Sequence, residues 1–162
     1  MPSHHDHLFR VAEEGQSAPP FDRDVALQFL EVLGAGGAVV TIANGCGAGA
    51  LAGTSGPCGL GNPDFAFTCQ NADPAAPFVL LSLALPTTPL PCGPCLLLAP
   101  TVLEALVPVG GAASRTLPIP PDSSLLDTQL LTQWLLAFGA AGPCPSFPFL
   151  SASNIVRVTI GL

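Results

Sequence analysis

Short apolar runs, separated by glycine- and proline-rich turns, recur along most of the chain. Residues 38–43 (AVVTIA) are mostly β-branched or small, and residues 78–85 (FVLLSLAL) form an apolar run with the length of a buried strand. In residues 64–72 (DFAFTCQNA) apolar positions alternate, so that Phe65, Phe67 and Cys69 share one face of an extended segment. These patterns predict strands rather than helices.

Later segments continue this pattern. Residues 101–109 (TVLEALVPV) predict a short strand or a single helical turn, residues 113–121 (ASRTLPIPP) an edge strand interrupted by proline, and residues 153–162 (SNIVRVTIGL) a closing strand. Many short strands with turns between them are typical of a β-sandwich or jelly-roll-like fold. We therefore expect one all-β domain over residues 25–162, preceded by an extended arm over residues 1–24.

One segment is ambiguous between helix and strand. Residues 122–138 (DSSLLDTQLLTQWLLAF) contain helix formers that follow an apparent N-cap at Asp122 or Ser123. The same segment also shows the alternation Leu131, Gln133, Leu135, which favours a strand. The residues of this segment alone leave both structures open.

The composition excludes several classes of partner. The chain of 162 residues has no lysine, only four arginines and a formal net charge of −7. Nucleic-acid binding and attraction to an anionic membrane surface both need clustered positive charge, so neither is expected. The longest apolar run is far shorter than the roughly 20 residues of a membrane-spanning helix, so no membrane span is expected. The 17 glycines and 19 prolines disfavour long helices, which again favours short strands.

Six cysteines in a short chain without lysine indicate a disulfide framework formed in an oxidising compartment. We therefore expect an extracellular or cell-surface protein. Residues 1–15 lack the apolar core of a signal peptide, and we expect the chain to be a mature or truncated product. Residues 44–63 predict a long glycine-rich loop that needs a tether, for which Cys46 and Cys58 are candidates.

The tetrapeptide Cys92-Gly93-Pro94-Cys95 is the redox motif of thioredoxins, and the segment after it resembles the helix that follows the motif there. A dithiol oxidoreductase is therefore one hypothesis, because a helix N-terminus lowers the pKa of a thiol. However, no βαβ unit precedes the motif, and four further cysteines would be open to exchange with it. We expect Cys92 and Cys95 to be structural half-cystines with separate partners.

The sequence predicts no catalytic group, cofactor site or metal site. Cys92 and Cys95 have the spacing of zinc ligands, but no second pair completes such a site. The sequence HHDH at residues 4–7 is expected to be a solvated polar terminus. Trp134 is a candidate platform for stacking a sugar ring, and the alternative is a residue of the core. The chain is therefore not expected to be an enzyme.

An ordered series of short motifs runs along residues 38–162. It comprises Gly45-Cys46-Gly47, Leu90-Pro91, Pro94-Cys95-Leu96, Gly111-Ala112-Ala113, Leu117-Pro118-Ile119-Pro120, Gln133-Trp134, and Ser153-Asn154 with Val158-Thr159-Ile160-Gly161. In this order the motifs resemble a β-rich module found near the C-termini of planctomycete-type secreted proteins. The resemblance implies that Gln133-Trp134 lies on a strand and that Cys46 pairs with Cys95, and it implies no activity. Residues 139–151, with Cys144 and three prolines, depart from the family pattern.

Four cysteines then remain, and they allow three connectivities. We expect Cys58–Cys69 across a short loop and Cys92–Cys144 across a long one. Closing a long loop removes entropy from the unfolded chain and stabilises the fold by roughly 3 to 5 kcal/mol.

Functions from different classes fit this description. The first is a secreted, non-catalytic structural protein that self-assembles, as a filament subunit whose N-terminal segment adds a strand to the sheet edge of a neighbour. The second is a monomeric extracellular module that binds carbohydrate or protein, and a minor third is the CGPC oxidoreductase. The candidate assembly segment is residues 25–33 (VALQFLEVL), with Val25, Leu27, Phe29 and Val32 as its apolar contacts.

Overall fold

The computed structural model confirms an all-β fold. It describes residues 37–47, 49–137 and 144–162. The described residues belong to one compact unit. The arm expected over residues 1–24 and the domain start expected at residue 25 lie outside the described residues. In the described part of the chain, no helix is long and apolar enough to cross a membrane.

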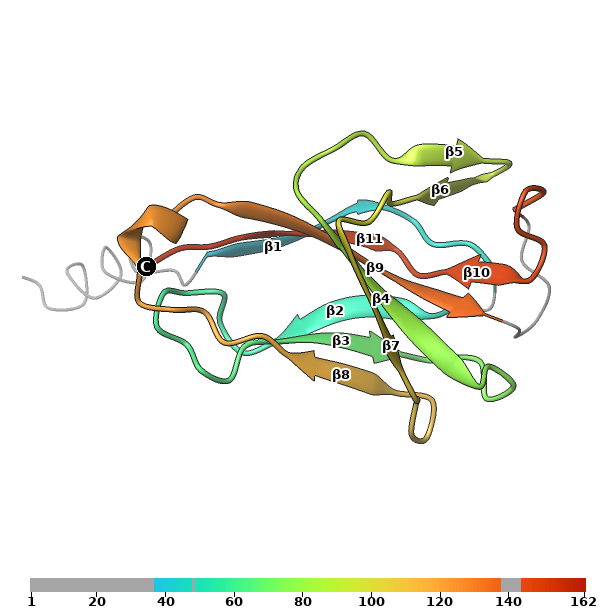
Figure 1. Cartoon of the computed structure of the whole chain (residues 1–162), viewed down its shortest axis with the longest axis horizontal. Coiled ribbons are helices and arrows are strands. Elements are labelled where there is room, and N and C mark those ends of the chain that lie inside the picture. The colour runs from blue at the N-terminus through green and yellow to red at the C-terminus, as the bar shows by residue number, and fades with distance from the viewer. Residues whose placement is uncertain (1–36, 48, 138–143) are drawn as a thin grey trace, which may run out of the picture. The chain divides into compact units, whose positions relative to one another are not determined.

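Two antiparallel sheets and one separate hairpin make up the fold (Figure 1). The larger sheet has the strand order β1-β11-β9-β4-β7, with β10 paired to the end of β9, and the smaller sheet has the order β2-β3-β8. The separate hairpin consists of β5 and β6. The elements are β1 (Ala38–Ala43), β2 (Leu51–Ser55), β3 (Ala66–Gln70), β4 (Phe78–Ala84), β5 (Leu90–Cys92), β6 (Cys95–Leu97), β7 (Val102–Leu106), β8 (Ala113–Thr116), the short 3-10 helix η1 (Ser123–Leu125), β9 (Gln129–Ala137), β10 (Leu150–Ala152) and β11 (Ile155–Thr159).

The two sheets form a sandwich around one apolar core. Trp134 and Leu136 of β9 both enter it from the larger sheet, because alternate residues of a strand share a face. Phe67 of β3 and the preceding Phe65 enter it from the smaller sheet, and their rings meet edge to face with centroids 5.2 Å apart. The face expected for Phe65, Phe67 and Cys69 is confirmed, since all three residues are buried in this core.

The opposite face of β9 is covered by the β5–β6 hairpin and the chain that follows it. Leu131 of β9 packs there against Ala84 of β4 and against Leu98. The buried amide of Gln133 binds the backbone of the same segment: its Oε1 accepts from the Leu98 N–H at 2.8 Å, and its Nε2 donates to the Leu96 carbonyl at 2.9 Å. β9 is therefore covered on both faces, and its buried polar side chain Gln133 is satisfied by hydrogen bonds to the backbone.

Most of the strands predicted from alternation and apolar runs are present. Residues 38–43 and 78–85 contain β1 and β4, and the edge strand predicted within residues 113–121 is β8. The ambiguous residues 101–109 contain a strand, β7, rather than a helical turn. The final segment, residues 153–162, contains β11, which lies between β1 and β9 in the larger sheet.

The structure also resolves the ambiguous residues 122–138. Asp122 does act as an N-cap, because its side chain accepts from the Ser124 N–H at 2.9 Å, but the helix it begins is the single turn η1. The rest of the segment is β9, as the Gln133-Trp134 resemblance implies. The prediction of one long loop over residues 44–63 is wrong, since β2 lies inside it. The sequence patterns also miss the β5–β6 hairpin and β10.

Candidate functional site

The two cysteines of the CGPC tetrapeptide lie at either end of the turn between β5 and β6, and each is bonded to a distant partner. Cys46 and Cys95 form one disulfide, with Cα atoms 5.5 Å apart. Cys92 and Cys144 form the other, with Cα atoms 5.0 Å apart. Both pairings agree with those expected from the sequence. The two bonds fasten the hairpin to the loop before β2 and to the chain before β10.

This pairing argues against the oxidoreductase hypothesis. A thioredoxin-type site needs the two sulfurs of the motif to bond each other reversibly at a helix N-terminus. In this chain the motif is a tight turn between two strands, in which Gly93 has a φ of 62°, and the strand β6 follows it instead of a helix. The CGPC tetrapeptide is therefore a structural element.

The third expected disulfide, Cys58–Cys69, is not formed, and this prediction is wrong. Both residues are buried thiols of the main core. Burial raises the pKa of the Cys69 thiol to about 11, and burial also raises the pKa of Cys58, with a backbone hydrogen bond acting in the opposite direction. Cys58 lies against Gly37, where a Cβ would come within 2.7 Å of the sulfur. A thiol with a raised pKa in an apolar core is a packing group rather than a nucleophile.

Trp134 does not lie at a binding surface. Its exposure is 0%, so the prediction of a sugar-stacking platform is wrong and the alternative, a core residue, is correct. Its indole Nε1 has no hydrogen-bond partner among the described residues. The same part of the chain contains no group of three or more His, Cys, Asp or Glu side chains placed to hold a metal ion.

The edge strands β7 and β8 of the two sheets lie beside each other, and we call the opening between them the β7–β8 seam. β7 pairs with β4 and β8 pairs with β3, and each strand ends its sheet. Arg115 of β8 donates from its Nε to Oε2 of Glu104 on β7 at 2.9 Å, and this ion pair bridges the seam. No strand of the described residues pairs with the outer side of either edge, which leaves backbone groups open to pairing.

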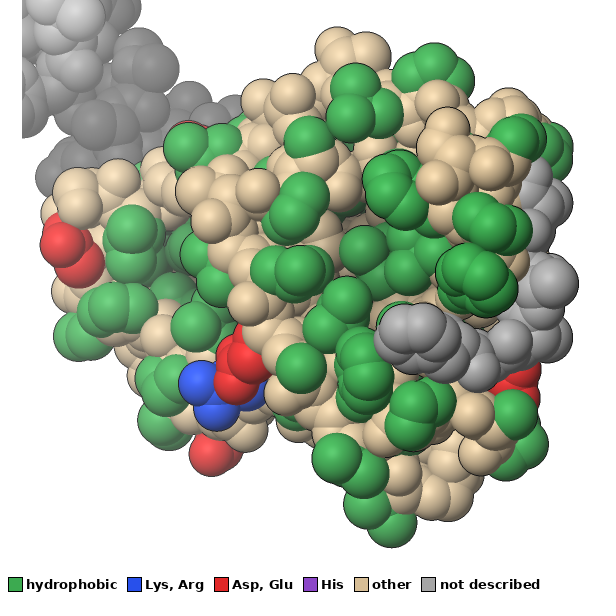
Figure 2. Space-filling view, turned by 45° about the vertical axis from the view of Figure 1, so that its right-hand side comes forward, with side chains coloured by type: hydrophobic (Ala, Val, Ile, Leu, Met, Phe, Trp, Pro, Cys, Tyr) green, Lys and Arg blue, Asp and Glu red, His purple; other side chains and the backbone are tan. Residues whose placement is uncertain are grey.

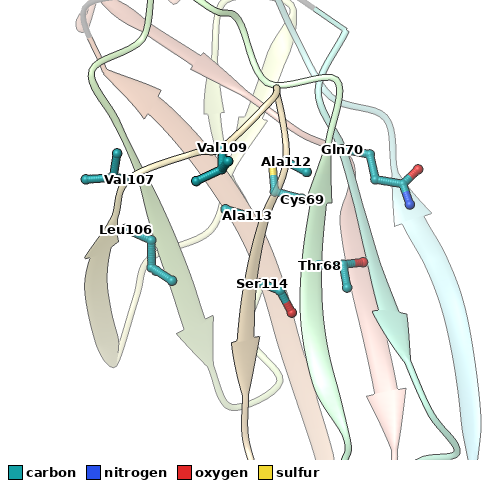
Figure 3. Close-up of a pocket in the computed structure, with 9 residues that line it drawn as sticks. All are labelled: Thr68, Cys69, Gln70, Leu106, Val107, Val109, Ala112, Ala113 and Ser114. Carbon is teal, nitrogen blue, oxygen red and sulfur yellow. The ribbon is translucent and has the colours of Figure 1, made fainter.

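Two apolar cavities follow one another along the seam. The first, of about 410 Å³, lies beside the turn that joins β7 to β8 and is drawn in Figure 3. Its lining includes the exposed Val107 and Val109 of that turn and the buried Cys69 of β3. The second, of about 440 Å³, is lined by the exposed Val102 and by core residues that include Phe67. The two cavities therefore lie against core residues that are themselves buried, since Phe67 and Cys69 are both 0% exposed.

Apolar side chains are strongly exposed around the seam. Val102, Val107 and Val109 are 52%, 73% and 81% exposed. Figure 2 shows a face of the molecule on which hydrophobic side chains cover much of the surface and charged side chains are few. Exposed apolar side chains beside open strand edges make the seam a candidate interaction site.

The strand β1 forms the opposite edge of the larger sheet, and it is apolar as well. It pairs with β11, and its other side has no strand partner among the described residues. Val39, Val40 and Ile42 are 45%, 44% and 40% exposed. An uncharged, β-branched edge of this kind is a second place at which another strand can pair.

Sequence reasoning did not find the seam. The signal that could have found it is Val107-Pro108-Val109, which places apolar side chains in a turn where polar residues are expected. The position of β7 and β8 as neighbouring edges of two sheets depends on the whole topology and has no local sequence pattern. The expected assembly residues lie outside the described residues: Val25, Leu27, Phe29 and Val32.

Comparisons with protein-family models, with curated proteins and with solved structures found no match. The function is therefore argued from the site itself. Any function must account for a disulfide-fastened hairpin and for an open apolar seam.

Proposed function

We propose that this chain is a secreted, non-catalytic structural protein that assembles with copies of itself. The observation that carries the proposal is the β7–β8 seam, where core residues line cavities that open to solvent between two strand edges. A sandwich with such a seam is incomplete on one side. A strand added from another molecule would pair with an open edge and cover the exposed apolar surface.

The disulfides support an extracellular or cell-surface location. The bonded cysteines are 49 and 52 residues apart in the chain, so each bond closes a long loop. Structural disulfides of this kind persist in oxidising compartments. The resemblance of residues 38–162 to a module of planctomycete-type secreted proteins points in the same direction.

The segment proposed to make the contact is residues 25–33 (VALQFLEVL). When this segment is extended, Val25, Leu27 and Phe29 share one face, and Gln28 lies on the other. In strand addition, main-chain hydrogen bonds supply affinity, and side chains that enter pockets supply specificity. An apolar segment of this kind matches an apolar seam.

Sedimentation velocity of the full chain over a range of concentrations tests the proposal. Species larger than a monomer are expected to grow with concentration, and Leu27→Glu is expected to suppress them because it places a charge on the apolar face. The matched control is Gln28→Glu, which adds the same charge to the opposite face and is expected to assemble as the unaltered chain does. A chain that stays monomeric at every concentration would contradict the proposal.

A second candidate is the monomeric extracellular binding module. The apolar lining of the two seam cavities favours an extended apolar peptide as its ligand over a carbohydrate, because sugar binding needs exposed aromatic faces and polar partners. The same sedimentation experiment separates the two functions. A strictly monomeric chain that binds an apolar peptide at the seam would support the binding module instead.

A further inference from the structure

We infer that the β7–β8 seam of one molecule is the acceptor for residues 25–33 of a second copy, with the added strand paired to β8. The inference rests on the proposed function and names the surface through which assembly occurs. It also predicts that the contact is head-to-tail, because the donor segment and the acceptor seam are different parts of the same chain.

The unequal size of the two sheets supports β8 as the strand that gains a partner. The smaller sheet has three strands, whereas the main path of the larger sheet has five. Residues Ala113–Thr116 of β8 pair with β3 on one side, and no described strand pairs with the other side. A fourth strand on that side would extend the smaller sheet across the seam and close it over β7.

The spacing of the β7 residues that line the two cavities matches the spacing of the apolar side chains in the donor. Val102 lines one cavity and Leu106 lines the other, and these residues are four apart on β7. Val25 and Phe29 are also four apart and share a face, so both pairs span about 13 Å in extended chain. One donor strand can therefore place an apolar side chain in each cavity.

The cavities have the capacity and chemistry that these side chains need. Their volumes are about 410 and 440 Å³, and most of their lining residues are apolar. The donor's central residue, Leu27, would lie between these two side chains, beside the Glu104–Arg115 ion pair whose side chains line the second cavity. Filling apolar cavities that open onto the core gives the donor its main source of affinity.

The donor segment and the acceptor seam lie in different parts of the sequence, so each copy of the chain can donate to one neighbour and accept from another. A head-to-tail contact that does not close on itself produces a filament.

The β1 edge is the rival acceptor. It offers backbone pairing and exposed side chains, but none of the three apolar cavities described for this fold is lined by a β1 residue. Strand addition there would lack the pockets that give specificity. The experiment must therefore distinguish the two edges, and Val40 of β1 provides a matched control for Val107 of the seam.

The test uses the full chain and three single variants: Leu27→Glu in the donor, Val107→Glu in the seam and Val40→Glu at the β1 edge. Val107 and Val40 are both exposed, so neither change buries a charge within the molecule, and circular dichroism verifies that the fold is kept. Val107→Glu is expected to raise the concentration needed for half-assembly at least about tenfold, whereas Val40→Glu leaves it unchanged. Val102→Glu tests the second cavity and is expected to act as Val107→Glu does.

Mixing two assembly-deficient variants gives the sharpest result. Leu27→Glu retains an intact seam and Val107→Glu retains an intact donor, so an equimolar mixture is expected to form a dimer and no larger species. If Val40→Glu blocks assembly and Val107→Glu does not, the acceptor is the β1 edge and the inference is wrong, although self-assembly stands. If the two variants do not complement each other, the inference is also wrong, and if the unaltered chain is always monomeric, the proposed function fails with it.

Discussion

The side-chain amide of Asn154 pairs with both backbone groups of Ala52. Its Oδ1 accepts from the Ala52 N–H at 2.7 Å, and its Nδ2 donates to the Ala52 carbonyl at 3.1 Å. Ala52 lies in β2 of the smaller sheet, and Asn154 directly precedes β11 of the larger sheet. The amide therefore occupies the place of a strand partner for Ala52 and links the two layers of the sandwich.

Replacing this amide is expected to destabilise the sandwich. Asn154→Ala leaves the partly buried N–H and carbonyl of Ala52 without these partners, and the free energy of unfolding is expected to fall by about 2 kcal/mol. Urea unfolding followed by tryptophan fluorescence measures the change. The control is Asn62→Ala, which also removes side-chain bonds to backbone but at an exposed turn, where a loss below about 1 kcal/mol is expected. Equal losses in the two variants would contradict the linking role of Asn154.

Replacing the buried Gln133 is expected to lower the free energy of unfolding at least as much as replacing Asn154. Gln133 fastens the β5–β6 segment to the larger sheet. Besides its bonds to Leu96 and Leu98, its Nε2 donates to the Ser153 carbonyl at 3.0 Å. Gln133→Leu leaves three backbone groups unsatisfied in a buried site, and a loss of about 3 kcal/mol in the free energy of unfolding is expected. Gln129→Leu, on the same strand and the same face but partly exposed, serves as the control and is expected to change stability by less than about 1 kcal/mol. A smaller effect at position 133 than at position 129 would show that the hairpin is held by other contacts.

The elements that could be predicted from the sequence are those with a local signal. β1, β3 and β4 show β-branched runs or period-two alternation, and these patterns follow directly from the pleat of a strand. The helical propensity of residues 122–138 misleads, because β9 is buried on both faces and therefore lacks the strict alternation of a half-buried strand. Only the single turn η1, which begins at the N-cap Asp122, is helical in that segment.

The elements that could not be predicted depend on distant partners. β2 contains Gly53 and has little strand propensity, and it is held by β3 and by Asn154, which is 102 residues from Ala52 in the sequence. The β7–β8 seam has the same origin, since two edges separated in the chain become neighbours only when both sheets are complete. The resemblance implies Cys46–Cys95, and Cys92–Cys144 is then one choice among three connectivities, whereas the thiol state of Cys58 and Cys69 has no local signature.

The cysteine assignment predicts the outcome of a mapping experiment. Mass spectrometry of the native protein is expected to show four hydrogens fewer than the fully reduced chain, with peptides that link Cys46 to Cys95 and Cys92 to Cys144. Replacing both cysteines of either bond by serine is expected to lower the free energy of unfolding by about 4 kcal/mol, the value that chain entropy gives for a loop of about 50 residues. A Cys92–Cys95 peptide, or a third bond between Cys58 and Cys69, would contradict the assignment.

The buried Cys69 thiol predicts a loss of stability in alkaline solution. Burial raises its pKa from 9.0 to about 11, so the folded chain keeps the thiol neutral while the unfolded chain ionises it. The stabilisation is complete below pH 9 and disappears as the pH rises toward 11, which amounts to a loss of about 1.4 kcal/mol between pH 8 and pH 10. Urea unfolding at the two pH values measures it, with Cys69→Ala as the comparison. An equal pH dependence in this variant would show that Cys69 is not responsible.

The most direct test of assembly by strand addition at β8 is hydrogen exchange at the amides of the seam. The assembled chain is compared with the monomeric Leu27→Glu variant, peptide by peptide, under the same solution conditions. We expect exchange in the assembled state to be slower over residues 113–117 and unchanged over residues 38–43. The reason is that new main-chain hydrogen bonds protect β8 and leave β1 open. Protection confined to residues 38–43, or no protection in either region of an assembled chain, would contradict the account.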